Sequence, residues 1–327
     1  VLFAARALGR PVRWVADRSE SFVADLHGRD HLSDCELAID AEGRFVALRV
    51  RDWADMGAYV SFFGAAIATR TGNRVANGAY HIPAIHAEIR AVLTNTAPTG
   101  PYRGAGRPET VYRLERLIDV AAIRIGMDPG ELRRRNLIRP DQIPYTNVVG
   151  QVYDSGCFPA SLDRALTRAD WQGFPARQSQ ARAKGRLRGR GVAAIVRAAQ
   201  TLLAEAGIKG TPQAGDVFDR ARAAADGSIR ATATATSPFC FPNGCHVCEV
   251  EIDRESGEVS IERYTVVDDV GTVIHPVIVE GQTWGAVVQG LGQALLERVV
   301  HDPSSAQLLT GSLMDYALPR TTLLPAM

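Results

Sequence analysis

The chain has 327 residues, a mean hydropathy of −0.06 and a formal net charge of +1 from 37 basic and 36 acidic residues. That length suits about two domains. A composition of 46% hydrophobic and 22% charged residues excludes intrinsic disorder, collagen and a disulfide-stabilised miniprotein. The even charge balance argues against a nucleic-acid binder, and no apolar run reaches the roughly 18 residues of a membrane span.

The first elements in chain order alternate between helices and β-structure. Residues 1–8 have the pattern of an amphipathic helix that ends at Gly9, and the missing N-cap and initiator Met indicate a fragment. A hairpin is expected over 35–53, and a further strand over 86–94. An apolar stripe of helical period predicts a helix over 111–126.

The later elements carry weaker signals. Asp128 caps a helix that ends near Asn136, residues 140–160 are expected to form a loop, and 161–171 a helix. The arginine-rich stretch 177–190 is interpreted as a solvated connector, with a nucleic-acid contact as the alternative. After a poorly patterned region, a hairpin is expected over 247–267 and a helix over 283–297, preceded by a loop over 279–285.

The five cysteines are odd in number and scattered, which favours a reducing compartment and predicts a cytoplasmic protein. Cys240, Cys245 and Cys248 have the C-x4-C-x2-C spacing of some two-iron clusters. However, residues 245–253 alternate like a strand, which places Cys245 and Cys248 on opposite faces. Buried strand thiols are therefore favoured over a metal site, and no metal ligand is assigned.

The segment 100–109 (GPYRGAGRPE) is the most informative one. Its glycines permit a close approach of a ligand, and Pro108 suits the first turn of a helix whose N-terminus faces the same space as Arg103 and Arg107. The segment is either an anion cradle or a plain glycine turn. Gln282, in the second loop, can donate and accept at once, which suits an oxo group or a pterin edge; a helix-capping amide is the alternative.

Several ordered motifs carry a family resemblance: 102–109 (YRGAGRPE), 115–119 (ERLID), 128–137 (DPGELRRRNL), 241–244 (FPNG), 249–253 (EVEID), 267–271 (VDDVG), 280–282 (EGQ) and 314–320 (MDYALPR). With them the chain resembles the molybdenum-binding subunit of the xanthine dehydrogenase and aldehyde oxidase family, and within it the carbon-monoxide-dehydrogenase-like large subunits. The resemblance implies an α+β fold with a first molybdopterin-binding region over 1–196, a weakly matching junction over 197–227 and a second region over 228–327.

The resemblance also implies a molybdenum hydroxylase, which oxidatively hydroxylates an aldehyde, a heterocycle or a similar small molecule with water as the oxygen source. The expected cofactor is molybdenum–molybdopterin in its cytosine dinucleotide form, and the expected partners are an FAD-binding subunit and a 2Fe-2S subunit. The residues expected to bind the cofactor are Arg103, Gly104, Ala105, Gly106, Arg107, Gly281 and Gln282.

Departures from the family pattern qualify these expectations. Gly104 stands where carbon monoxide oxidisers carry a cysteine, so carbon monoxide is not the expected substrate. The family's catalytic glutamate belongs beyond Met327, so no catalytic residue is assigned, and an upstream and a middle cofactor loop are absent. The isolated chain is therefore expected to be inactive, with a non-catalytic assembly protein as the alternative.

Overall fold

The structure is a computed structural model that describes residues 1–196, 199–200 and 239–323. In chain order its helices and strands are α1 (Leu2–Leu8), α2 (Arg18–Ala24), β1 (His31–Ile39), β2 (Phe45–Asp55), α3 (Gly64–Ala66), β3 (Ala84–Val92), α4 (Arg107–Ile125), α5 (Pro129–Asn136), β4 (Tyr145–Thr146), β5 (Val152–Tyr153), α6 (Phe158–Arg168), α7 (Phe174–Ala183), β6 (Leu187–Val196), β7 (Ala199–Gln200), β8 (Phe239–Cys240), β9 (Asn243–Ile252), β10 (Val259–Asp269) and α9 (Pro276–Leu295). Short helical turns lie at η1 (Ile67–Thr71), η2 (Asn73–Val75), η3 (Pro140–Gln142), η4 (Trp171–Gly173) and η6 (Thr321–Leu323).

The first sheet has the strand order β1-β2-β3. The predicted hairpin is confirmed: β1 pairs antiparallel with β2, with Leu37 opposite Leu48. The predicted third strand is also confirmed, and β3 lies parallel to β2. A parallel neighbour requires a long crossover, and the connection between β2 and β3 contains α3, η1 and η2. This crossover brings η1 and η2 into contact with α4 and its preceding loop.

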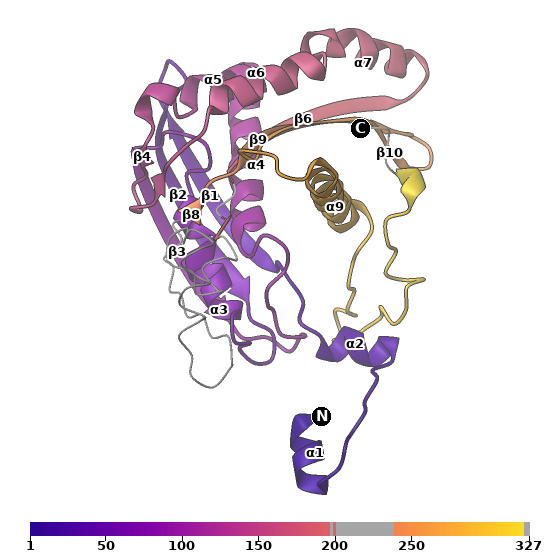
Figure 1. The fold of residues 1–327 in the computed structure, drawn as a ribbon. Coiled ribbons are helices and arrows are strands. Elements are labelled where there is room, and N and C mark those ends of the chain that lie inside the picture. The colour runs from indigo at the N-terminus through magenta and orange to yellow at the C-terminus, as the bar shows by residue number, and fades with distance from the viewer. Residues whose placement is uncertain (197–198, 201–238, 324–327) are drawn as a thin grey trace.

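The second sheet has the antiparallel order β10-β9-β6, which confirms the second predicted hairpin. Figure 1 shows α6 and α7 along one side of this sheet and α9 on the other. A single hydrophobic cluster joins the two sheets and contains Leu48 and Val50 of β2, Ile118 of α4, Leu162 of α6, and Val192 and Val247 of the second sheet. The predicted domain boundary at residue 196 stays a prediction. Strand β6, which precedes this boundary, pairs with strand β9, which follows it.

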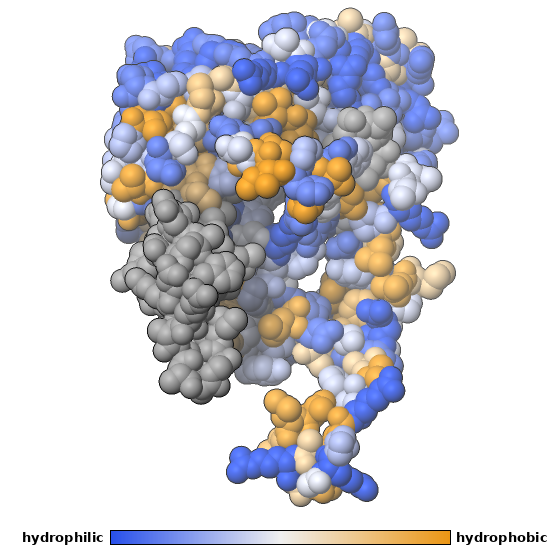
Figure 2. Space-filling view, in the orientation of Figure 1, coloured by the Kyte–Doolittle hydropathy of each residue, from blue (hydrophilic) through white to orange (hydrophobic). Residues whose placement is uncertain are grey.

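The predicted helices near α1, α4, α5 and α6 are confirmed, with α1 ending at Gly9 in a left-handed conformation (φ 63°). Figure 2 shows apolar side chains on α1, where Leu2 and Phe3 are exposed. Residues 140–160 are not purely loop, because β4 and β5 pair there. In the part of the chain that the structure describes, no helix is long and apolar enough to cross a membrane.

The interpretation of 177–190 as a solvated connector is wrong. Most of its arginines lie on α7 and β6, and acidic side chains of the second sheet pair with Arg177, Arg186 and Arg188. Arg177 reaches Glu249 at 3.0 Å, and Arg188 reaches Glu262 at 2.6 Å. Arg190 stacks 3.4 Å from the centroid of the Trp171 ring. Because most of these charges have partners within the fold, the stretch is an ordered part of the second sheet and its covering helix.

The cysteines of the second hairpin behave as strand residues. Cys245 and Cys248 lie in the unbroken strand β9, where Cys245 is fully buried. Burial, with a smaller contribution from nearby Glu115, raises the pKa of Cys245 to about 12, and burial raises that of Cys248 to about 11. A thiol that stays protonated is a poor metal ligand. Within the described residues no group of three His, Cys, Asp or Glu side chains could hold a metal ion.

Candidate cofactor-binding site

The loop before α4 has an unusual backbone. Gly104, Ala105 and Gly106 have φ angles of 100°, 46° and 87°, so three consecutive residues are left-handed. The turn is closed by the amide of Ala105, which donates to Tyr102 O at 2.8 Å, and by that of Arg107, which donates to Gly104 O at 3.3 Å. Because Ala105 has a Cβ atom, a left-handed backbone costs it conformational energy that the two glycines avoid. Residues with strained backbone conformations are found most often at functional sites.

One side of this loop is sealed against the crossover connection. A Cβ atom at Gly106 would lie 2.5 Å from Ile67 O, and one at Gly72 would lie 2.3 Å from Gly106 O. Two glycines therefore allow backbone to touch backbone. Thr71 Oγ1 donates to Ala105 O at 2.7 Å, the shorter of its two contacts with carbonyl oxygens, the other being Ile67 O at 2.9 Å. The loop is thus fixed on the side that faces η1, while the Arg103 side chain remains exposed.

The exposed side of the loop meets α9. Arg103 Nη2 donates to Gln282 Oε1 at 2.7 Å and to Gln282 O at 2.9 Å. A Cβ atom at Gly285, one turn further along α9, would lie 3.2 Å from Arg103 Nη1, so the glycine makes room for the guanidinium. Residues predicted separately, and 179 positions apart, therefore lie in one site.

The predicted loop over 279–285 is wrong, because α9 already begins at Pro276. Proline is pre-organised for the first helical turn, and the His275 side chain accepts from Ile278 N at 3.4 Å. Gly281 and Gln282 are therefore helical. Both residues are also exposed. The periodicity missed this start because Gly281 and Gly285 weaken the helical pattern.

Arg29, which the sequence did not single out, ties these parts together. Its guanidinium lies 4.4 Å from the centroid of the Tyr102 ring and donates to Arg103 O and to Gln293 Oε1 of α9. Arg29 itself is left-handed, with φ 63°. The sequence carries no signal for this role of Arg29, because arginine is not a residue typical of a left-handed backbone. Its contact with Arg103 O also spans 74 positions.

Buried polar atoms without partners gather around the loop. They include Arg29 Nε, Arg107 Nε and Glu109 Oε2. Burial lowers the pKa of Arg29, although Glu109 opposes this, and burial together with the charge of Arg74 lowers that of Arg107. The desolvated guanidinium of Arg107, next to the like charge of Arg74, favours a bound anion.

A second cluster lies beneath the loop, at Asp52 of β2. The carboxylate is 2.9 Å from His31 Nδ1, 2.7 Å from Ser33 Oγ and 2.8 Å from Arg113 Nη1. Burial alone would raise the pKa of Asp52. The hydrogen bonds from His31 and Ser33 and the charge of Arg113 outweigh burial and lower it. The folded state therefore stabilises the ionised carboxylate.

This lowered pKa predicts a pH-dependent contribution to stability. The contribution is fully present above the unfolded-state pKa of about 3.9 and is lost as pH falls through the lower folded-state value. We expect Asp52→Asn to reduce the free energy of unfolding clearly at pH 7 and by a smaller amount at about pH 3. Urea denaturation of both proteins at the two pH values measures this, and a difference that grows as pH falls would contradict it.

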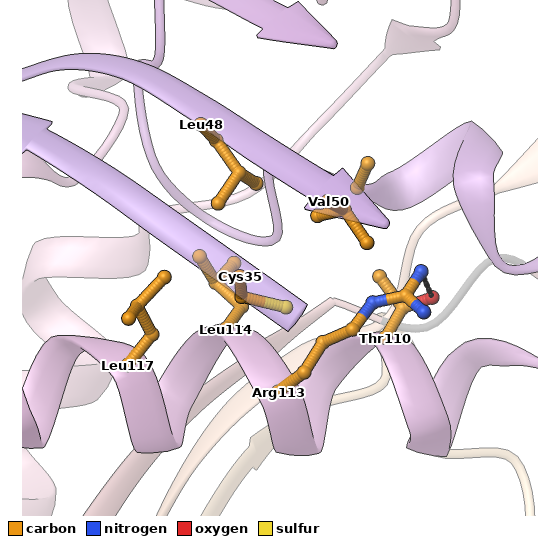
Figure 3. A pocket seen from close by; sticks show the side chains of 8 residues that line it. Cys35, Leu48, Val50, Thr110, Arg113, Leu114 and Leu117 are labelled. Atoms are coloured by element: carbon orange, nitrogen blue, oxygen red, sulfur yellow. Dashed lines mark hydrogen bonds between the residues drawn. The ribbon is translucent and has the colours of Figure 1, made fainter. Parts of the chain in front are cut away.

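Two cavities in the described part of the chain differ in character from the site at the loop. The pocket in Figure 3 lies between the first sheet and α4, is lined by Cys35, Leu48, Val50, Leu114 and Leu117 among others, and has no room for a water molecule. A groove of about 680 Å³ is lined by residues of α5, α6 and η4. Its carboxylates are paired with arginines, for example Asp163 with Arg134 at 2.6 Å.

Comparison with known protein families decides the affiliation. Family models of the molybdopterin cofactor-binding domain match residues 1–137 and 213–325, so only 138–212 and the last two residues are unmatched. This chain belongs to the molybdopterin cofactor-binding family. Arg103 lies in the first matched region of this molybdopterin-binding chain and Gln282 in the second, so their hydrogen bond joins the two.

Three relatives each cover 97–99% of the chain. The large chain of carbon monoxide dehydrogenase from Hydrogenophaga pseudoflava is 28% identical over 97% of this chain, and the nicotine 6-hydroxylase large subunit of Paenarthrobacter nicotinovorans is 26% identical over 98%. The structure of quinoline 2-oxidoreductase from Pseudomonas putida 86 superposes with a TM-score of 0.88 at 27% identity, over 99% of this chain and 57% of that one. The chain spans 56% and 55% of the two curated relatives' lengths. The α+β fold and the family resemblance are confirmed.

Proposed function

We propose that this chain is the molybdenum-binding part of a molybdenum hydroxylase, an oxidoreductase that hydroxylates an aldehyde, a heterocycle or a similar small molecule with oxygen from water. The observation that carries the proposal is the Arg103–Gln282 contact, which joins the loop before α4 and helix α9 into one basic site. The relatives named above are likewise a dehydrogenase, a hydroxylase and an oxidoreductase.

The residues present fit an anionic pterin cofactor. The Nε atoms of Arg29 and Arg107 lie buried at the loop without a hydrogen-bond partner, although Arg29 Nε is 3.9 Å from Glu109 Oε1. The glycines leave the loop backbone open to close approach. The residues that would hold the cofactor are Arg103, Gly104, Ala105, Gly106, Arg107, Gly281 and Gln282, together with Arg29. A bound molybdenum–molybdopterin group supplies the two-electron redox chemistry of hydroxylation.

Arg103 and Gln282 orient each other. Because Gln282 Oε1 accepts from Arg103, the Nε2 group is the end of the amide that can donate to a ligand. Arg29 keeps the loop in register with α9 through Arg103 O and Gln293. These residues bind and orient; the acid–base chemistry of hydroxylation is not assigned to any of them.

The loop favours an organic substrate over carbon monoxide. A Cβ atom at Gly104 would lie 2.5 Å from Pro108 Cγ, in a backbone conformation that side chains rarely adopt. A cysteine at this position would therefore strain the loop in its present shape. We propose that the chain works with an FAD-binding and a 2Fe-2S subunit and takes the cytosine dinucleotide form of the cofactor. The cytoplasmic location stays a prediction.

The test is turnover by the complex purified with its partner subunits. Dye-linked oxidation of aldehydes and N-heterocycles in ¹⁸O-labelled water should give a product that carries the label. Partner subunits that co-purify without molybdenum and without turnover would instead indicate a non-catalytic assembly protein.

Arg103 should control how firmly the cofactor is held. Arg103→Met removes a charged donor that also orients Gln282, so we expect cofactor affinity to fall by about 10- to 100-fold, the usual effect of one charge-assisted hydrogen bond. Molybdenum per protein after dialysis measures this. Arg49→Met is the matched control, because Arg49 is an exposed arginine on β2 that pairs with Glu36 of β1. Equal retention in both variants would contradict the assignment.

A further inference from the structure

We propose that Arg113 is a positioning residue for the glycine loop: anchored on buried Asp52, it orients the Thr110 hydroxyl so that this hydroxyl holds the carbonyl of Gly106. The inference rests on the proposed function, in that the loop so held is the one assigned to the cofactor.

The anchor is the carboxylate of Asp52, whose side chain is fully buried. Arg113, on α4, is nearly as buried, with 9% of its side chain exposed, and its Nη1 donates to Asp52 Oδ2 at 2.8 Å. His31 and Ser33 of β1 hold the same carboxylate from the other side. The guanidinium is therefore fixed relative to the first sheet.

The orientation follows from the hydrogens available. Arg113 Nη2 lies 3.1 Å from Thr110 Oγ1, a contact drawn in Figure 3. An arginine can only donate, so the hydroxyl accepts from it and keeps its single hydrogen for another acceptor. That acceptor is Gly106 O, 3.1 Å away. Arg113 thus determines which way the Thr110 hydroxyl points.

The same guanidinium reaches the segment on the other side of the loop. Arg113 Nη2 also donates to Asn73 Oδ1 at 3.1 Å, and Asn73 Nδ2 donates to Thr69 O at 3.0 Å in η1. The neighbouring Thr71 holds Ala105 O. Two adjacent loop carbonyls are therefore held by two threonines from two segments, and Arg113 links those segments.

The surroundings of Arg113 make this arrangement hard to replace. Leu48, Val50 and Leu114 close the space beside its stem, where no water molecule fits. A lost partner there cannot be exchanged for solvent, and an unsatisfied buried donor or acceptor is costly.

Hydrogen exchange of the loop tests the inference in the purified complex. Thr110→Val keeps the side-chain volume and the Asp52–Arg113 pair but removes the hydroxyl. We expect the amides of Ala105 and Arg107 to exchange about tenfold faster, as expected for one lost hydrogen bond. Thr110→Ser should restore the wild-type rate. Arg113→Met should accelerate the same amides, and the double variant should add little.

The matched control is Arg177→Met on α7, which removes another partly buried arginine that pairs with two carboxylates. It should leave the loop amides unchanged. Wild-type exchange in Thr110→Val, no rescue by serine, or additive effects of the two variants would overturn the inference. Exchange that responds as expected in a protein without molybdenum would support the positioning role while contradicting the proposed function.

Discussion

Replacing Gly106 with alanine should lower the free energy of unfolding by about 3 kcal/mol. Gly106 has φ 87°, and an added Cβ would lie 2.5 Å from Ile67 O and 2.9 Å from Thr71 Oγ1. The carbonyl oxygen of Ile67 cannot move away without displacing η1, to which Ile67 belongs. The cost therefore combines a left-handed backbone for an L-residue with overpacking. Cofactor retention should fall as well, because the loop must shift.

The matched control lies at the other end of the same helix. Gly126 follows α4 with φ 68°, and a Cβ there would meet nothing within 4 Å. Gly126→Ala should cost only the conformational term, about 1 kcal/mol. Urea denaturation of both variants measures the difference. Equal destabilisation would show that the contact with η1 does not constrain the loop.

Replacing Arg133 with methionine should lower the free energy of unfolding by about 3–5 kcal/mol. Arg133 is fully buried, and its Nε donates to Glu115 Oε2 at 2.8 Å while its Nη1 lies 2.8 Å from Asp119 Oδ1. Tyr80 donates to the other oxygen of Glu115 at 2.7 Å. Removing the cation leaves the Glu115 carboxylate buried without its charge partner, and burial already raises its pKa.

The partner substitution separates charge from packing. In Arg133→Met/Glu115→Gln no buried charge is left alone, and Tyr80 can still donate to the amide oxygen. We expect the double variant to regain at least half of the lost stability. A double variant that is as unstable as Arg133→Met would mean that lost packing, rather than the unpaired charge, causes the effect.

Local signals explain what the sequence could predict. Both hairpins have strands of alternating apolar and polar residues around short polar turns. Helix α4 has an apolar stripe, and helix α5 begins with an Asp-Pro pair. These features depend on residues close in sequence, so one chain suffices to find them. The family resemblance added the assignment of the loop at Arg103 and of Gln282 to a molybdopterin cofactor.

Contacts between distant segments explain what the sequence could not predict. The sequence predicts a connector over 177–190, because the carboxylates that pair with Arg177 and Arg188 lie far along the chain in β9 and β10. Arg29 has a left-handed backbone and joins the loop to α9 by donating to Arg103 O and to Gln293 Oε1. The start of α9 was hidden by Gly281 and Gly285, and the latter makes room for Arg103. In each case, tertiary packing determines the local role.

Locating the metal tests the central claim most directly. Crystals of the complex purified from a host that makes the cofactor, measured at the molybdenum absorption edge, give the metal position from anomalous scattering. We expect one strong peak next to residues 103–107 and Gln282. A peak elsewhere in the chain, or no peak there in a complex shown to contain molybdenum, would contradict it.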